Sequence, residues 1–416
     1  MNNALTWVFL AALAASTGTR LWLAARQARH VRAHRDAVPA SFAGAIEIGA
    51  HRKAADYTVA KTRLGMADAG LSALAVLALT LGGILQWLSD AWARVAPPFG
   101  IAHGTLLVVS VVALLAALEL PLTLYRTFVI EERFGFNRMT LRLFAADALM
   151  GIALSAAFGI PLLLAVLWLM GKAGAWWWLY VWAVLVAFSV AMQLVVPTFI
   201  MPWFNKFTPL GDGPLAERVQ QLLERCGFRS RGLFVMDGSK RSSHGNAFFA
   251  GVGASKRIVL FDTLVDRLEP VEVEAVLAHE LGHYKLHHIR KMLAFSSLST
   301  LAGLFVLGLL VDRPWFYEGL GVQTKTLAMA LVLFVVAAPA FTFFLHPLGT
   351  LLSRKHEFEA DAYATRHAQA ADLVQALVKL YRDNSATLTP DPVHSAFYDS
   401  HPPAATRIAR LRAQPA

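Results

Sequence analysis

Cysteine is almost absent from this chain of 416 residues, which contains only Cys226. A single cysteine excludes an intrachain disulfide and any metal site built from several thiolates. Charged residues are also scarce, at 16% of the sequence, whereas an average soluble domain carries about 25%. A chain with so few charges does not have the composition of a soluble globular protein.

Hydrophobic residues take their place: they make up 56% of the sequence and include 26 phenylalanines and 11 tryptophans. This composition indicates a membrane protein, in which indole rings anchor at the interface with water. The formal net charge is +10. In a membrane protein such an excess is typical of basic cytoplasmic loops, so we expect a lipid bilayer as a partner and no nucleic acid.

Seven apolar stretches are long enough to cross a bilayer, which takes about 20 helical residues. The second and sixth are the least apolar, since serine and threonine interrupt them. The expected spans are 5–25, 69–88, 101–124, 148–170, 176–196, 292–310 and 327–345. We predict a mainly α-helical, polytopic membrane protein with four regions: five N-terminal transmembrane helices with basic cytoplasmic loops (1–197), a cytoplasmic segment (198–291), transmembrane helices six and seven (292–346) and a cytoplasmic C-terminal segment (347–416).

The distribution of basic residues predicts the orientation. No basic residue precedes the first span, and five arginines lie at or beyond its end, from Arg20 to Arg35. This pattern is typical of a retained anchor and not of a cleaved signal peptide. The segments after the first and third spans are the basic ones. The positive-inside rule therefore puts the N-terminus outside, and residues 199–291 and those after 345 in the cytoplasm.

The most informative motif is His279-Glu280-Leu281-Gly282-His283. Residues four apart share one face of a helix, so both imidazoles can bind one ion. Zinc accepts such nitrogens, and Glu280 stands where it can deprotonate a zinc-bound water. Chance predicts roughly 0.03 such motifs in a chain of this composition, so a coincidental pair of surface histidines is the weaker alternative.

A catalytic zinc needs a third protein ligand and an open position for water. Glu357 and Asp361 follow the seventh span and share a helix face. Two membrane spans, the sixth and the seventh, separate these residues from the histidine motif. Both segments are therefore expected on the same side of the membrane. We expect Glu357 to bind the metal and Asp361 to hold a ligand histidine by a hydrogen bond. On their own, such carboxylates on a helix that leaves the membrane would simply be solvated. Four polar neighbours are weaker candidates: His287, His288, His356 and Glu359.

The segment 198–291 predicts a small α+β unit with a short sheet. An amphipathic helix is expected at about 215–226, followed by strands at 232–236, 246–250 and 257–261. A helix that begins near Pro270 carries the histidine motif. After the seventh span, residues 353–381 predict one more amphipathic helix.

Several longer segments accompany the motif in a definite order: EERFGFN at 131–137, KRSSHGNA at 240–247, RIVLFDTL at 257–264, SRKHEFEADA at 353–362 and YDSHPP at 398–403. With these segments the chain resembles the type I CAAX prenyl proteases, which are integral-membrane zinc metallopeptidases. The resemblance covers nearly the whole chain. It implies seven helices around a large chamber and a zinc-metallopeptidase domain outside the membrane.

The resemblance also implies roles at the metal centre. The zinc ligands would be His279, His283 and Glu357, one Zn²⁺ per chain. Glu280 would be the general base that takes a proton from the attacking water. Asp361 would hydrogen-bond a ligand histidine and so fix its orientation. Composition alone leaves Co²⁺ and Mn²⁺ open as less typical ions for the same groups.

Four further residues match positions near the substrate in that family. Asn246 and Ala247 would lie on an edge strand that holds an extended peptide by main-chain hydrogen bonds. His401 would stabilise the oxyanion, and Arg407 would bind a C-terminal carboxylate or position His401. Taken alone, Asn246 is an ordinary strand-end residue and His401 an ordinary loop residue before two prolines.

The sequence therefore predicts an integral-membrane zinc metalloendopeptidase that removes C-terminal residues from prenylated or similar peptides. The alanine- and arginine-rich composition indicates a bacterial inner membrane, where prenylated proteins are not expected, so the natural substrate stays open. One alternative is a membrane quality-control metalloprotease of broader specificity. A remote alternative is a transporter or scaffold with structural zinc, although such a site normally has four protein ligands.

Overall fold

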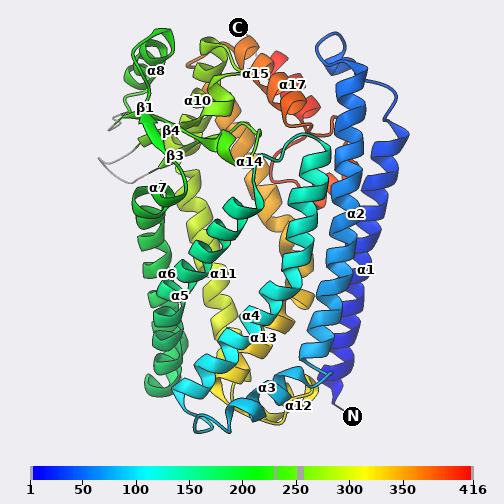
Figure 1. The fold of residues 1–416 in the computed structure, drawn as a ribbon, viewed down its shortest axis with the longest axis vertical. Helices are drawn as coiled ribbons and strands as arrows, with labels where there is room; N and C mark the ends of the chain where they lie inside the picture. The colour runs from blue at the N-terminus through cyan, green and yellow to red at the C-terminus, as the bar shows by residue number, and fades with distance from the viewer. Residues whose placement is uncertain (1–2, 229–231, 251–256, 414–416) are drawn as a thin grey trace.

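Seven long helices run between the two ends of the molecule, as Figure 1 shows. The computed structural model describes residues 3–228, 232–250 and 257–413. Within these residues, the helices that can cross a bilayer are α1 (Ala4–Ala33), α2 (Ile48–Leu79), α4 (Ile101–Tyr125), α5 (Leu141–Lys172), α6 (Trp177–Val195), α11 (His288–Leu310) and α13 (Leu327–Thr342). The predicted number of spans is confirmed. Because this number is odd, the two termini lie at opposite ends of the molecule (Figure 1).

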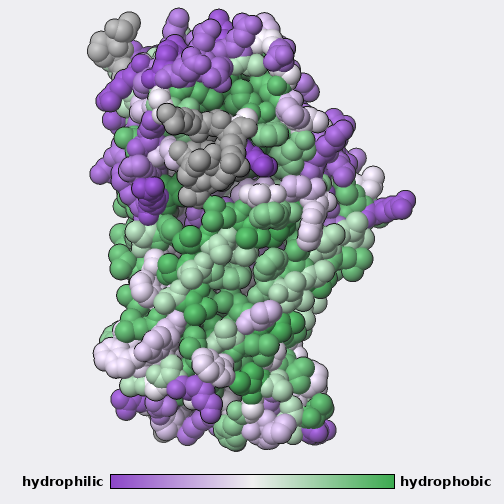
Figure 2. Space-filling view, turned by 90° about the vertical axis from the view of Figure 1, so that its left-hand side faces the viewer, coloured by the Kyte–Doolittle hydropathy of each residue, from purple (hydrophilic) through white to green (hydrophobic). Residues whose placement is uncertain are grey.

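The surface of the helical part is apolar. Figure 2 shows a broad band of hydrophobic residues between two polar ends. Large side chains remain exposed on the long helices, among them Trp7, Leu149, Trp168 and Leu298. A soluble protein rarely leaves contiguous apolar surface of this extent in water. The chain is therefore an integral membrane protein that crosses the bilayer several times.

Helix α13 is the most buried of the seven and contacts α1, α4, α5 and α11. Met329, Ala330 and Leu333 on this helix are completely buried. Gly104 of α4 lies against it so closely that a Cβ at this position would come within 2.8 Å of the Ala328 Cβ. Small residues of this kind let transmembrane helices approach and pack tightly.

The second span differs from its predicted position. Residues 69–88 were expected to cross the membrane, but α2 begins at Ile48 and ends at Leu79, and the short α3 (Ile84–Trp92) follows. The first half of α2 is rich in charged residues, so its sequence predicted a loop outside the membrane. In the structure Lys61 and Asp68 line a cavity of about 390 Å³ together with Glu119 and Arg126, so these charges face polar groups and not lipid.

A second cavity, of about 350 Å³, lies between α1, α2, α4 and α13 and contains Arg20, Asp68 and Glu119 among apolar neighbours. Both cavities place ionisable groups on the inner side of the helices. The single large chamber implied by the resemblance stays a prediction.

Short helical turns connect or extend the long helices. They are η1 (Ala40–Phe42), the π-helical turn η2 (Arg126–Glu131) that continues α4, η3 (Gly174–Trp176), the π-helical turn η4 (Val196–Ile200) and α7 (Met201–Phe204) after α6, η5 (Gly238–Lys240), α9 (Asp262–Val265), α12 (Pro314–Gly319) and η7 (Phe343–Leu345). Through η7, α13 leads directly into α14, which carries the chain out of the helical bundle.

A four-stranded sheet lies at the same end as the C-terminus (Figure 1). Its strands are β1 (Phe207–Pro209), β2 (Leu233–Met236), β3 (Ala247–Ala250) and β4 (Arg257–Phe261), in the order β1-β2-β4-β3. Strands β2 and β4 are parallel, and the outer pairs are antiparallel. The three predicted strands are confirmed, whereas β1 was not predicted because it has three residues and ends in a proline. Strand β3 forms one edge.

Six helices complete this end: α8 (Pro214–Arg225), α10 (Pro270–Lys285), α14 (His346–Ala364), α15 (Ala370–Asp383), α16 (Pro392–Tyr398) and α17 (Ala404–Arg412). All of them except α16 contribute to one core, in which Leu222, Leu277 and Ile408 are completely buried. The single helix predicted over 353–381 is wrong: it breaks between α14 and α15. The break lets α15 turn its apolar face onto α10 while α14 continues the line of the seventh span.

Candidate active site

Helix α10 presents the histidine motif to α14. Its start is fixed by a capping box between Glu269 and Glu272, with Pro270 in the first turn. Gly282, inside the motif, lies where a Cβ would be 3.0 Å from the Ala360 Cα of α14. Only glycine lets the two helices approach this closely. This approach brings Glu357, one turn away on α14, to the two histidines of α10.

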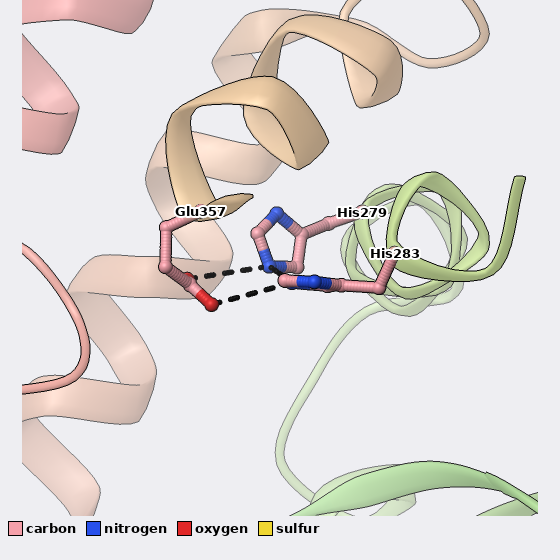
Figure 3. Close-up of side chains that lie close together, drawn as sticks. All are labelled: His279, His283 and Glu357. Carbon is pink, nitrogen blue, oxygen red and sulfur yellow. Dashed lines mark hydrogen bonds and ion pairs between the residues drawn. The ribbon is translucent and has the colours of Figure 1, made fainter. Parts of the chain in front are cut away.

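Three side chains converge on one point, as Figure 3 shows. Nε2 of His283 lies 3.2 Å from Nε2 of His279 and 3.2 Å from Oε1 of Glu357, and His279 Nε2 lies 3.5 Å from Glu357 Oε2. Around a tetrahedral ion with bonds of about 2.0–2.1 Å, ligand atoms lie about 3.3 Å apart. The Oε2 atom of Glu357 is buried, and no group in the described part of the chain donates a hydrogen bond to it. The three predicted ligands therefore fit one metal ion.

The other face of His279 is held by a buried ion pair. Its Nδ1 lies 2.8 Å from Oδ1 of Asp361, so the predicted partnership of these two residues is present. Burial alone would lower the pKa of His279, but its hydrogen bonds to Asp361 and Glu357 raise that pKa to about 9. The same bond leaves Nε2 as the nitrogen that points to the metal position.

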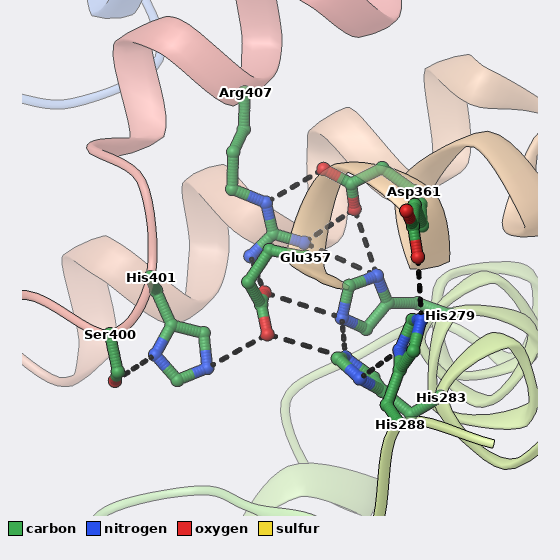
Figure 4. A network of polar contacts seen from close by, with 9 residues as sticks. His279, His283, His288, Glu357, Asp361, Ser400, His401 and Arg407 are labelled. Atoms are coloured by element: carbon green, nitrogen blue, oxygen red, sulfur yellow. Dashed lines mark hydrogen bonds and ion pairs between the residues drawn. The ribbon is translucent and has the colours of Figure 1, made fainter. Parts of the chain in front are cut away.

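Arg407 of α17 completes this cluster (Figure 4). It is 6% exposed, and its Nε and Nη2 donate to the two carboxylate oxygens of Asp361 at 2.9 and 2.5 Å. Its Nη1 lies 3.3 Å from Oε2 of Glu357. The expectation that Arg407 binds a substrate carboxylate is at odds with this geometry, because its guanidinium already faces two carboxylates inside the protein.

The two predicted catalytic residues come from α10 and from the loop before α17. His401 lies in the loop between α16 and α17, its side chain is 63% exposed, and its Nε2 is 3.3 Å from Oε1 of Glu357. Ser400 Oγ lies 3.0 Å from the other ring nitrogen (Figure 4). Glu280 follows His279 on α10 and is partly exposed. Within the described residues it has no ion pair or hydrogen bond, so its carboxylate is free to accept a proton.

Two family models together cover nearly the whole chain. The model of the CAAX prenyl protease N-terminal region with five membrane helices matches residues 27–206, and the model of peptidase family M48 matches residues 209–414. A CAAX prenyl protease 1 homolog of Arabidopsis thaliana is 35% identical over 385 residues, 90% of each chain. The chain belongs to peptidase family M48.

Two further relatives agree with this membership. CAAX prenyl protease 1 of Saccharomyces cerevisiae is 38% identical over 314 residues, which is 70% of this chain and 68% of the yeast protein. The crystal structure of S. mikatae Ste24p has a TM-score of 0.92 and 30% identity, and the match covers 99% of this chain and 100% of that one. This M48 peptidase is thus a multi-pass membrane metalloprotease of the CAAX-protease type, which acts on peptide or protein substrates. The predicted family, fold class and enzyme class are confirmed.

In this M48 peptidase, the predicted substrate-contacting residues lie at the start of β3. The backbone oxygen of Asn246 accepts from Phe261 N at 3.0 Å. In an antiparallel pair the bonding direction alternates along the strand, so the N–H and C=O of Ala247 point away from β4, towards the open edge. Asn246 Oδ1 accepts from this N–H at 2.8 Å. An added strand at this edge would have to take the Ala247 N–H from the Asn246 side chain.

Residues that the sequence analysis did not single out hold this edge in place. Glu131, in the EERFGFN segment, accepts from the Tyr57 hydroxyl at 2.7 Å and lies 3.6 Å from Nε2 of His244. Asn384 Oδ1 lies 3.2 Å from His244 Nδ1 and accepts from Gly245 N at 3.2 Å. His244 and Gly245 directly precede the edge strand. A signal was present for Glu131, His244 and Gly245, which lie in motifs that carry the resemblance, whereas Tyr57 and Asn384 lie outside those motifs.

Proposed function

We propose that His279, His283 and Glu357 hold a zinc ion and that the chain hydrolyses peptide bonds with an activated water. The observation that carries this proposal is the spacing of the three ligand atoms, together with Glu280, which follows His279 and has no ion pair among the described residues. Bound there, zinc would polarise the scissile carbonyl and lower the pKa of a bound water from 15.7 to about 7. Mixed nitrogen and oxygen ligands in a three-residue set are typical of catalytic zinc.

Three side chains carry out the other steps of the proposed reaction. Glu280 takes the proton from the attacking water and passes it to the leaving amine. His401, exposed at the open side, donates from its ring to the oxygen that becomes negative. Asp361 holds His279 in the tautomer that presents Nε2.

Arg407 has a different role in this proposal from the one expected from sequence. It fixes Asp361 and Glu357 together and so orients two of the groups that form the metal site. In the Arg407→Lys variant the positive charge remains but the two-pronged bond to Asp361 is lost. We expect its zinc dissociation constant to rise about 10–100-fold, measured by competition with a chromophoric chelator.

The Arg407→Lys variant also distinguishes orientation of the metal ligands from binding of a substrate carboxylate. If Arg407 only orients the ligands, the ratio of kcat/KM for peptides with free and amidated C-termini stays as in the wild type once zinc is saturating. A variant with unchanged zinc affinity but a collapsed preference for the free carboxylate would restore the substrate-binding role.

We propose further that the substrate is the C-terminal end of a prenylated or similar peptide, supported by the relatives, which are CAAX prenyl proteases. Purified protein would be incubated with matched farnesylated and unprenylated CAAX peptides and with a misfolded membrane protein, and the cuts mapped by mass spectrometry. We expect cleavage after the cysteine, with higher kcat/KM for the farnesylated peptide. Efficient cleavage of the misfolded protein at many sites, with neither CAAX peptide cut, would instead establish a quality-control protease.

The edge of β3 predicts how the peptide is held. If the peptide pairs with Ala247 as an added strand, only alternate substrate residues bond to the edge. Peptides methylated at one backbone nitrogen at a time should therefore alternate between normal KM and KM raised about tenfold, the cost of roughly one hydrogen bond. Uniform KM values across the set would show that β3 does not bind the peptide backbone.

We propose that this end of the molecule faces the cytoplasm and the N-terminus faces outside, as the basic residues between Arg20 and Arg35 favour. The division into regions 1–197, 198–291, 292–346 and 347–416 remains part of this proposal. Green fluorescent protein fused to the C-terminus should fluoresce in bacterial cells, whereas alkaline phosphatase at the same position should be inactive. The reverse pattern would invert the assigned orientation.

A further inference from the structure

The second ring nitrogen of His283 has a partner outside the site described so far. Its Nδ1 lies 3.0 Å from Nδ1 of His288, the first residue of α11. His288 is only 3% exposed, and its Nε2 lies 2.9 Å from Oε2 of Glu359 on α14. Figure 4 shows His288 beside His283, on the far side from Glu357. Three side chains from three helices thus form one line of hydrogen bonds.

A count of protons gives this line a direction. When Nε2 of His283 binds a metal, its Nδ1 must carry the ring proton. That N–H can donate only if Nδ1 of His288 is unprotonated, which puts the proton of His288 on Nε2. The Nε2–H then donates to the carboxylate of Glu359. Every bond in the line has one donor and one acceptor, with both imidazoles neutral.

We propose that His288 and Glu359 act as a positioning relay that fixes the tautomer and orientation of the metal ligand His283. The proposal rests on the zinc site put forward above. It assigns His283 the kind of support that Asp361 gives His279. Asp361 reaches His279 directly at 2.8 Å. His283 lies one turn further along α10, and the carboxylate of α14 reaches it through an interposed imidazole.

The surroundings of the relay hold it still. The ring of His356 stacks on that of His288, with centroids 4.0 Å apart and planes 10° from parallel. Lys291 and Lys355 each place their Nζ 3.9 Å from a carboxylate oxygen of Glu359. These contacts restrict both members of the relay without themselves touching His283.

The same residues could instead be considered a second ion site, since one ligand atom each of His288, His356 and Glu359 lie within 4.8 Å of one another. Two observations favour the relay. Ring lone pairs lie in the ring plane, so two nearly parallel stacked rings do not direct them at one ion. A metal on Nε2 of His288 would also put a proton on its Nδ1, facing the N–H of a metal-bound His283 at 3.0 Å.

The test is the zinc dissociation constant of the full-length protein in detergent, measured by competition with a chromophoric chelator. His288→Phe keeps a ring to stack on His356 but offers no acceptor, and its zinc dissociation constant should rise about 10–100-fold. His288→Asn can place an amide oxygen near the position of Nδ1, and it should restore most of that loss. Glu359→Ala should weaken zinc binding in the same direction as His288→Phe.

His356→Phe is the matched control, because it keeps the stacked ring and lies outside the relay. It should bind one zinc with wild-type affinity.

Unchanged zinc affinity in His288→Phe and Glu359→Ala would overturn the relay. So would a zinc affinity of His288→Asn no higher than that of His288→Phe. Two zinc ions in the wild type and one in His356→Phe would show a second metal site instead. Failure of the wild type to bind zinc at all would refute the proposed function and not the relay alone. If His288→Phe does not fold, the zinc affinity of Glu359→Ala alone tests the relay, because the Glu359 side chain is partly exposed.

Discussion

Replacement of Glu280 by glutamine should lower kcat for peptide cleavage by about 10²–10⁴-fold and leave one zinc bound per chain. The amide has the shape of the carboxylate but cannot take a proton from water. The side chain makes no ion pair or hydrogen bond within the described residues, so its removal leaves no partner unsatisfied and should not disturb the fold.

The measurement is turnover of a CAAX peptide together with zinc content by atomic absorption. Glu318→Gln, an exposed carboxylate on α12 at the other end of the molecule, is the control and should behave as the wild type. A Glu280→Gln enzyme that retains near wild-type turnover would remove Glu280 from the mechanism.

Replacement of Glu357 by alanine should abolish both zinc binding and activity. This carboxylate is the third corner of the ligand triangle, at 3.2 and 3.5 Å from the two histidines. Its loss leaves two neutral imidazoles, which hold zinc weakly, and leaves Arg407 with one buried carboxylate in place of two.

Treatment of the wild type with a chelator should produce the same inactive state, and added zinc should restore it. The alanine variant should stay inactive in the zinc concentration that restores the wild type, while circular dichroism shows the same helix content. Full zinc occupancy in that variant would mean that the metal is held by other groups.

The metal-site geometry could be predicted because it depends on rules that act along the chain. The i, i+4 spacing on one helix brings His279 and His283 together, and two crossings of the membrane return Glu357 to their side. The relay could not be predicted in this way. His288 and Glu359 are 71 positions apart, and only the packing of α11 against α10 and α14 places them beside His283.

Two other differences have a similar cause. The charges of Lys61 and Asp68 exclude a lipid-facing helix, but the structure turns them inward to a cavity, which periodicity does not reveal. From the resemblance, Arg407 was expected to bind a substrate carboxylate or to position His401. Its partners in the structure are Glu357, which was assigned to the metal, and Asp361, which was assigned to a ligand histidine; only the position of α17 brings Arg407 to them.

In the proposed metal site, the arginine of α17 also contributes to the charge that a bound ion must balance. Glu280, Glu357 and Asp361 contribute three negative charges, and Arg407 returns one positive charge, so the protein groups sum to −2. In the proposed site, a divalent ion with a neutral water brings this sum to zero, while a monovalent or trivalent ion would leave a net charge beside the buried Glu357 and Asp361. In the proposed site, the charges of these four side chains therefore favour a divalent ion, and a substitution that changes their sum shifts that preference.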